Sequence, residues 1–493
     1  MALKLNREPN LTAKHEGFRY QTAAVEAIQN LDYAAVFHEQ GLGKTKIGVD
    51  LALIWLKLDI VDSVLVVTKR GLIQNWTEEL QLHSHLVPRI LSQDKRRNFY
   101  AFNSPARLYL THYEVMKSES KRLELFLKTR RVGVILDEAH KIKNPESIVT
   151  QKLFDLSSGF VRRVIMTGTP IANRPYDLWA QIFFLDSGNA LGSNFAKFKE
   201  SLDLTNDLAR NASMVRGFED KLSRIYEKLK GFTVRETKDA LEIQLPNKIF
   251  RNVSVEMEAR QGEIYNIIKR EFALYVVKGN EAKLDESDEI LKRLLRLVQT
   301  ASNPKLIDDS YQNMPAKFPI LERMLYEITV RKEKAIVWTS FTKNVDWLKK
   351  ELRKFGVVSV HGKISQEERN RAIAAFKNEA ETRVLIATPA SAKEGLTLTV
   401  ANHAIFYDRN FSLDDYLQAQ DRIHRISQVK TCYVTNLVAS GTIDEWVDVL
   451  LSAKHLAARL AQGDITKDQY MQEADYAYGE MIKDILDAKD QNL

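Results

Sequence analysis

A glycine-rich segment near the start of the chain has the residue types of a phosphate-binding loop. An apolar run at Ala34–Phe37 predicts a strand, the segment His38–Thr45 reads HEQGLGKT, and Lys46–Leu58 predicts an amphipathic helix. A strand, a glycine turn and a helix N-terminus together aim backbone N–H groups and a positive dipole end at phosphate oxygens. The segment therefore predicts a nucleotide site.

Four residues of this loop are candidate nucleotide ligands. Gly41 and Gly43 would form the turn, Lys44 would reach the β- and γ-phosphates, and the hydroxyl of Thr45 would ligate Mg²⁺. One position departs from the usual pattern, because His38 stands where the loop normally opens with glycine. The alternative is a glycine turn that only caps a buried helix.

A second candidate site is the acidic pair that ends an apolar run. The segment Val134–His140 reads VILDEAH. An acid at the carboxyl end of a parallel strand points into the ligand crevice of an open α/β sheet. Asp137 suits the Mg²⁺ shell, and Glu138 suits a base that orients and deprotonates the attacking water. The alternative is a solvated helix cap, since acids are common at helix starts.

A third candidate lies far along the chain. Arg422 and Arg425 stand three residues apart in the segment QAQDRIHRISQ, so on a helix they would share one face. Two arginines on one face can clamp a γ-phosphate supplied from another domain, as arginine fingers do. A solvated basic helix face is the alternative.

Apolar runs of strand length must position these residues. In the first half they are Ala34–Phe37, Val64–Val67, Leu108–Leu110, Val132–Leu136 and Val164–Met166, and in the second half Ala335–Trp338, Val357–Val360, Val384–Ala387, Ala404–Tyr407 and Cys432–Val438. Helical patterns follow these runs, which is typical of parallel sheets with crossover helices. Residues 173–335 read mostly as helix.

These patterns predict an α/β protein with two RecA-like lobes, each a parallel sheet flanked by helices. We expect an ATP-binding lobe at 1–185, helical protrusions and a linker at 186–315, and a lobe with the arginine fingers at 316–455. An acidic helical tail is expected at 456–493.

Composition limits the class of protein. Lys and Arg outnumber Asp and Glu by 72 to 65, which gives a net charge of +7 and weakly favours a nucleic-acid partner. From Gln462 onward there are eight acidic residues and three lysines, so the rest of the chain is the more basic part. No apolar run suits a membrane span or a secretory signal, and a single cysteine, Cys432, fits a reducing interior. We therefore expect an intracellular protein.

Seven motifs in order carry a resemblance to a known family. They are FRYQ, GLGKT, DEAHKIKNPES, MTGTPIAN, IVWTSF, EGLTLTVA and QAQDRIHRISQ, and they span most of the chain. The chain resembles the Swi/Snf-type ATPases of helicase superfamily 2. Its motif around Gly395 lacks the double glycine of chromatin remodellers, so it is closer to the distant branch of annealing helicases and prokaryotic or viral members.

The resemblance implies further residue roles. Gln21 would read adenine, and Thr169 would couple ATP to nucleic acid. Gln428 would join Glu138 and the two arginines in catalysis. DNA contacts would come from Lys69, Thr111, Tyr113, Asn173, Ser340, Gly395 and Thr397, with Gly395 also in coupling. Trp76, after the first DNA-contacting loop, is interpreted as core packing.

The expected function is a DNA-stimulated ATPase that uses ATP and Mg²⁺ to move along double-stranded DNA, gripping backbone phosphates with weak sequence preference. The helical middle segment is longer than in strand-separating relatives. Two alternatives stay open: a strand-separating or annealing helicase on DNA or RNA, and a non-hydrolysing scaffold that binds DNA or a protein. A protein that recruits the motor is a further partner that the sequence leaves open.

Overall fold

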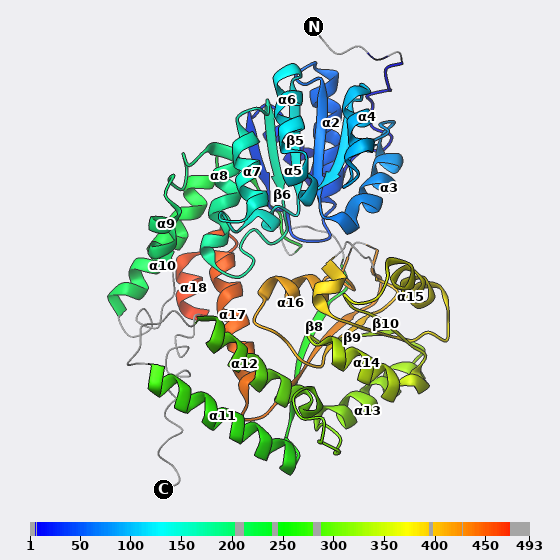
Figure 1. Cartoon of the computed structure of the whole chain (residues 1–493), viewed down its shortest axis with the longest axis vertical. Coiled ribbons are helices and arrows are strands. Elements are labelled where there is room, and N and C mark those ends of the chain that lie inside the picture. Colours follow the sequence, from blue (N-terminus) through cyan, green and yellow to red (C-terminus); the bar gives the residue numbers. More distant parts are fainter. Residues whose placement is uncertain are drawn as a thin grey trace. The chain divides into compact units, whose positions relative to one another are not determined.

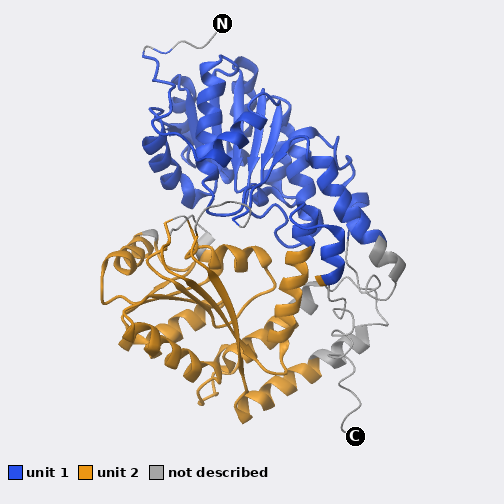
Figure 2. Cartoon of the chain, turned by 180° about the vertical axis from the view of Figure 1, so that it is seen from behind, with its two compact units in different colours: residues 1–204, 213–243, 457–472 blue, residues 205–212, 244–456, 473–493 orange. Residues whose placement is uncertain are grey.

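The computed structural model describes residues 5, 7–202, 212–238, 245–279, 287–393, 398–425 and 427–473. The chain divides into two compact units (Figures 1 and 2). Unit 1 comprises residues 1–204, 213–243 and 457–472, and unit 2 comprises residues 205–212, 244–456 and 473–493. The units are discontinuous in sequence, unlike the four consecutive segments expected above, because two later segments pack with the first unit.

Unit 1 is built on a parallel sheet of seven strands in the order β3-β4-β2-β5-β6-β1-β7. The strands are β1 (Tyr33–Val36), β2 (Ser63–Thr68), β3 (Arg89–Ile90), β4 (Leu108–His112), β5 (Val132–Asp137), β6 (Arg162–Met166) and β7 (Thr233–Val234). Every residue of β2 and β5 is buried, as expected for central parallel strands with helices on both faces. The carboxyl ends of β1, β6 and β5 are therefore neighbours at one edge.

Unit 2 contains a second parallel sheet, of six strands, in the order β10-β11-β9-β12-β13-β8. The strands are β8 (Lys248–Val255), β9 (Ala335–Trp338), β10 (Val357–Val360), β11 (Val384–Ala387), β12 (His403–Phe406) and β13 (Cys432–Ala439). Alternate residues of β9 enter two separate hydrophobic clusters, Ile336 and Trp338 in one and Ala335 and Val337 in the other. Both faces of this sheet are thus covered.

Helices surround the two sheets (Figure 1). Those in unit 1 are α1 (Arg19–Ile28), α2 (Lys44–Lys57), α3 (Ile73–His83), α4 (Lys95–Asn103), α5 (Tyr113–Ser118), α6 (Ser120–Thr129), α7 (Ile148–Ser157), α8 (Trp179–Asp186), α9 (Phe195–Leu202), α10 (Ala212–Leu229) and α18 (Lys467–Glu473). Those in unit 2 are α11 (Ala259–Gly279), α12 (Ser287–Ser302), α13 (Lys317–Val330), α14 (Thr342–Glu351), α15 (Gln366–Asn378) and α16 (Leu413–Gln420). Helix α17 (Ile443–Ala461) begins in unit 2, and its residues from Ala457 onward belong to unit 1.

The predicted fold class is confirmed, and all ten predicted strands are present with ends displaced by at most two residues. The middle segment also contains β7 and β8, which the helical pattern did not reveal. Strand β8 lies at an edge of its sheet and leaves most of its side chains exposed, Phe250 and Arg251 among them, so it lacks the continuous apolar run that marks a buried parallel strand. Within the described residues, no helix is long and apolar enough to cross a bilayer.

Candidate nucleotide site

The glycine-rich segment forms a tight turn between β1 and α2. Gly41 and Gly43 have positive φ angles of 88° and 67°, a conformation that side chains disfavour. Helix α2 begins at Lys44 with Gly43 as its N-cap, so the backbone N–H groups of its first turn point toward the loop. Most of the residues of α2 are themselves buried, on nearly every side of the helix, so α2 is a core helix and not the amphipathic helix expected. The turn is therefore anchored to the centre of unit 1.

The Lys44 ammonium lies inside the curl of this loop. Its Nζ donates to the carbonyl oxygens of His38 at 2.9 Å and Glu39 at 3.2 Å. A Cβ on Gly168, in the loop after β6, would lie 2.5 Å from Cγ of Gln40 and 3.2 Å from Nζ of Lys44. Only glycine permits so close an approach. The segment Thr167–Thr169 after β6, called the TGT segment below, therefore packs directly against the phosphate loop.

His38 is fully buried at the base of the loop. Burial, followed by the nearby charge of Lys44, lowers the pKa of His38 to about 4. The imidazole is therefore neutral near pH 7, and its ring centroid lies 6.0 Å from that of Tyr20 on α1. A bulky neutral side chain thus occupies the position where the loop pattern normally has glycine.

Gln21 covers the turn from helix α1. Its Nε2 donates to the carbonyl oxygens of Leu42 at 3.2 Å and Gly43 at 3.4 Å, and its Oε1 accepts from the backbone N–H of Phe18 at 2.9 Å. A Cβ on Gly43 would lie 2.3 Å from this Nε2. The FRYQ motif therefore lies against the loop, beside the exposed ring of Phe18, which stacks on Tyr20. The adenine contact of Gln21 stays a prediction.

Asp137 is a buried carboxylate with three hydrogen-bond donors. Its Oδ2 accepts from Oγ1 of Thr68 at 2.9 Å and from Nε1 of Trp76 at 2.8 Å, and its Oδ1 accepts from the backbone N–H of Glu138 at 3.0 Å. Burial, followed by the neighbouring charge of Glu138, raises the pKa of Asp137 to about 6, against the lowering effect of the Trp76 and Thr68 hydrogen bonds. The carboxylate is thus held in one orientation at the end of β5.

Trp76 therefore does more than pack in the core. It is almost fully buried, as the sequence interpretation assumed, but its indole N–H also orients Asp137. A buried indole usually finds an acceptor, yet no spacing in the sequence connects Trp76 with Asp137, 61 residues away. The hydrogen bond from Thr68 to Asp137 was not predicted for the same reason.

Glu138 has a left-handed backbone, with φ of 55°, which is uncommon for a residue with a side chain. Its Oε2 lies 3.2 Å from Nδ1 of His140. That nitrogen is also 3.2 Å from Oγ1 of Thr167, while Nε2 of His140 lies 2.9 Å from Nζ of Lys69. An ammonium can only donate, so Nε2 accepts and the imidazole proton is assigned to Nδ1, facing Glu138 and Thr167.

The magnesium prediction fits the available oxygen ligands. Within the described residues, no group of three or more His, Cys, Asp or Glu side chains suits a metal ion. Magnesium commonly takes one or two protein carboxylates together with water and nucleotide phosphates. The Asp137 carboxylate and the Thr45 hydroxyl at the start of α2 provide hard oxygens of that kind.

The predicted arginines of unit 2 do not lie on a helix, which corrects the expectation. Helix α16 ends at Gln420, Arg422 lies in the turn that follows, and Arg425 lies in a bend. The backbone N–H of Arg422 bonds the carbonyl of Ala419, and Nε of Arg425 donates to the carbonyl of Asp421 at 3.2 Å. Arg422 is only 2% exposed, whereas Arg425 is partly exposed. The two guanidinium groups therefore have different surroundings.

Two family models match the chain. The model described as the SNF2-related domain matches residues 20–306, more than half of the chain, and the helicase conserved C-terminal domain matches residues 316–427. The chain belongs to the SNF2-related family. The predicted Swi/Snf-type resemblance is thereby confirmed.

Relatives agree with this membership. An uncharacterized ATP-dependent helicase of Mycoplasma genitalium, MG018, is 27% identical over 445 residues, covering 87% of this chain and 40% of that protein. The DNA repair and recombination protein RAD54 of Saccharomyces cerevisiae is 26% identical over 470 residues, covering 83% and 50%. The chain thus spans half or less of the length of these relatives. A solved Sulfolobus solfataricus SWI2/SNF2 ATPase core in complex with dsDNA covers 98% of both chains at 24% identity, with a TM-score of 0.41.

Two predicted DNA contacts of this SNF2-related chain have side chains that bond inside unit 1. Thr111 and Tyr113 are fully buried. The Thr111 hydroxyl donates to the carbonyl of Leu91 at 3.1 Å, and the Tyr113 hydroxyl donates to the carbonyl of Asp137 at 2.8 Å. Both hydroxyls thus have partners within unit 1, that of Tyr113 at the end of β5, and the DNA contacts of these two residues stay predictions.

Gln428 is a buried residue with many hydrogen bonds. Its Nε2 donates to the carbonyl oxygens of Thr399, Ala401 and Ile423, and its Oε1 accepts from the backbone N–H groups of the next two residues. A buried amide with all these bonds ties together the loops on either side of β12. This arrangement gives Gln428 a structural role, and its part in catalysis stays a prediction.

The other predicted contacts have varied surroundings. Thr169 is buried, and its backbone N–H bonds Oγ1 of Thr167 at 3.1 Å. Asn173 and Ser340 are partly buried, with backbone N–H groups bonded to the carboxylates of Asp177 and Asp408. Gly395 and Thr397 lie outside the described residues.

Asp408 was not found from the sequence. Its Oδ2 accepts from hydroxyls of Ser302 at 2.7 Å and Thr339 at 2.5 Å, and its Oδ1 from the backbone N–H of Ser340 at 2.6 Å. The carboxylate is 1% exposed and fixes the segment after β9. An acid that follows an apolar strand is the same signal that marked Asp137, and it was present at Tyr407-Asp408.

Proposed function

We propose that this chain is an ATP-driven motor that moves along double-stranded DNA without necessarily separating its strands. The observation that best supports the proposal is the arrangement at one edge of the unit 1 sheet. The phosphate loop follows β1, the TGT segment follows β6 and the acidic pair follows β5, and these three strands are adjacent. One edge thus brings together anion-binding amides, a lysine, a carboxylate pair and a threonine-rich loop.

Each residue of the predicted site has its own proposed role in ATP hydrolysis. The amides at the start of α2 and the Lys44 ammonium bind the phosphates, with Lys44 exchanging loop carbonyls for phosphate oxygens. Thr45 and Asp137 hold Mg²⁺, which supplies charge neutralisation of the phosphate groups. Glu138 orients a water molecule and accepts its proton. Arg422 and Arg425 are proposed to stabilise the γ-phosphate during turnover.

The DNA partner is supported by charge and by relatives. The net charge of +7 and the basic residues after β2, such as Lys69, favour contact with backbone phosphates. RAD54 is named a DNA repair and recombination protein, and the Mycoplasma relative an ATP-dependent helicase. Residues 173–335 form a longer middle segment than strand-separating relatives have. By the resemblance to Swi/Snf-type ATPases, this length favours duplex translocation over strand separation.

A triplex displacement assay tests the proposal. A motor that moves along intact duplex should remove a third strand from its path in an ATP-dependent manner, while a fork substrate of two strands stays paired. Separation of the fork strands without triplex displacement would favour the helicase alternative. Binding to DNA with no hydrolysis of ATP would favour the scaffold.

A further inference from the structure

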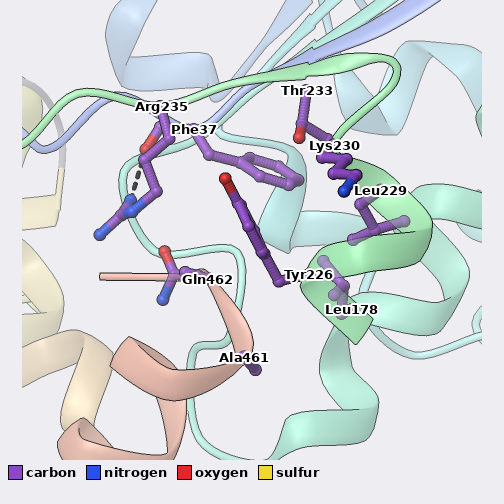
Figure 3. Close-up of a pocket in the computed structure, with 9 residues that line it drawn as sticks. All are labelled: Phe37, Leu178, Tyr226, Leu229, Lys230, Thr233, Arg235, Ala461 and Gln462. Atoms are coloured by element: carbon purple, nitrogen blue, oxygen red, sulfur yellow. Dashed lines mark hydrogen bonds between the residues drawn. The ribbon is translucent and has the colours of Figure 1, made fainter. Parts of the chain in front are cut away.

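A cavity of about 210 Å³ lies within unit 1, next to the residue that precedes the phosphate loop. Its walls come from Phe37 at the end of β1, Tyr226 on α10, Arg235 after β7, and Gln462 just beyond α17. Figure 3 shows Tyr226 extending from α10 toward Phe37 and Arg235. The cavity is thus lined both by the residue that precedes the phosphate loop and by the end of α17, and one of its lining side chains contacts both regions.

Arg235 is that side chain. Its Nε and one terminal nitrogen donate to the two carboxylate oxygens of Asp464, in a bidentate pair. Its other terminal nitrogen donates to the carbonyl oxygen of Phe37 (Figure 3). The side chains of Arg235 and Asp464 are only 16% and 12% exposed. A bidentate, partly buried guanidinium pair is stronger and more directional than a surface ion pair.

The carbonyl of Phe37 directly precedes the phosphate loop. The segment that carries Arg235 makes further contacts along the loop. The backbone N–H of Glu39 bonds the carbonyl of Glu236, and the Glu39 carboxylate accepts from the backbone N–H of Lys238 at 2.8 Å. The Lys238 ammonium lies 3.3 Å from the same carboxylate. Residues 235–238 therefore form a strap along one side of the loop.

We propose that Asp464 is a positioning residue for nucleotide binding. Its carboxylate orients the Arg235 guanidinium, and this guanidinium holds the carbonyl at the start of the phosphate loop, so the segment after α17 sets the affinity of the loop for nucleotide. The inference rests on the proposed role of the loop as the nucleotide site. No sequence motif indicates it, because 229 residues separate Arg235 from Asp464.

The same region offers a matched control. Lys467 on α18 lies 2.6 Å from Asp220 on α10, in a pair that is more exposed. This pair also ties the segment after α17 to unit 1, but neither of its residues belongs to the loop or the strap. Lys467→Ala therefore removes an anchor of the segment without removing the contact to Phe37.

The test measures ADP and ATP dissociation constants by calorimetry, together with KM and kcat, for Asp464→Asn, Arg235→Gln, the double variant and Lys467→Ala. We expect each of the first two to weaken nucleotide binding about three- to tenfold, with kcat at saturating ATP little changed. The nucleotide affinity of the double variant should match that of either single variant, because the two substitutions break the same Arg235–Asp464 contact. Asp464→Glu, which keeps the charge, should restore affinity to within about twofold.

Two other outcomes would reject, respectively, the positioning role of Asp464 and the loop as the nucleotide site. If Asp464→Asn only lowers the melting temperature, as Lys467→Ala would, and leaves nucleotide affinity unchanged, Asp464 is an anchor and not a positioning residue. Lys44→Ala separates the two proposals. Unchanged nucleotide binding in that variant would reject the loop as the nucleotide site, whereas its loss, with normal binding by Asp464→Asn, would reject the positioning role alone.

Discussion

The ammonium of Lys69 lies 2.9 Å from Nε2 of His140, two residues beyond the proposed base Glu138. Lys69 follows β2 and is a predicted DNA contact, whereas His140 reaches both Glu138 and Thr167 through its other nitrogen. One imidazole therefore touches the residues proposed for DNA binding and for water activation. We expect DNA to affect hydrolysis through this contact.

Lys69→Ala tests this coupling. If Lys69 acts through His140, the variant should lose most of the DNA-stimulated turnover even at saturating DNA, while ATP affinity and the turnover without DNA change little. If Lys69 were only a contact to DNA phosphates, its removal would weaken DNA binding, and excess DNA would then restore the full turnover rate. The measurement is kcat against DNA concentration at low salt, and full recovery at high DNA would reject the coupling.

Trp76→Phe tests the support of Asp137. The variant keeps an aromatic ring but removes the indole N–H, so a buried carboxylate oxygen loses one of its two side-chain donors. We expect a loss of about 1–3 kcal/mol in the free energy of unfolding, with a lower kcat in the folded protein. Chemical denaturation and steady-state ATPase assays measure the two effects.

Trp55→Phe is the control for that variant. Trp55 is equally buried on α2, and its N–H donates to the carbonyl of Gln29 at 3.2 Å, away from the acidic pair. The Trp55→Phe variant should have a lower free energy of unfolding but an unchanged kcat. If the two tryptophan variants have the same kcat, the hydrogen bond to Asp137 has no part in catalysis.

Arg425→Lys tests the proposed finger. Lysine keeps the charge but cannot offer a planar fork to phosphate oxygens, so nucleotide and DNA binding should persist while stimulated kcat falls by about 10³-fold or more. Arg425 is the cleaner target because Arg422 is nearly fully buried, and its removal would also disturb packing. Stimulated turnover near the parent rate would remove Arg425 from the mechanism.

The sequence predicted those parts of the fold that have a strong local signal. Each fully apolar strand run, such as Val132–Leu136, was found, because burial on both faces of a parallel sheet demands such a run. Strand β8 was missed because an exposed edge strand does not need a continuous apolar run. The phosphate loop and the acidic pair were located because a short motif and its flanking elements specify them.

Side-chain partners beyond the motifs could not be predicted. Family patterns assigned the hydroxyls of Thr111 and Tyr113 to DNA, but both are used inside unit 1. Trp76 and Asp464 reach their partners across 61 and 229 residues, and such distances carry no periodic signal. The turns that carry Arg422 were mistaken for helix because i, i+3 spacing does not distinguish a helix from turns that follow one.

The most direct test of the account is the ATPase rate with blunt linear duplex, single-stranded DNA and RNA, each from low to moderate salt. The motor should be stimulated by the duplex far more than by RNA, and the stimulation should fall steeply with salt because backbone phosphates provide the contact. Glu138→Gln, which still binds ATP, should show almost no turnover under any condition. No stimulation by duplex, or equal stimulation by RNA, would contradict the proposed duplex DNA motor.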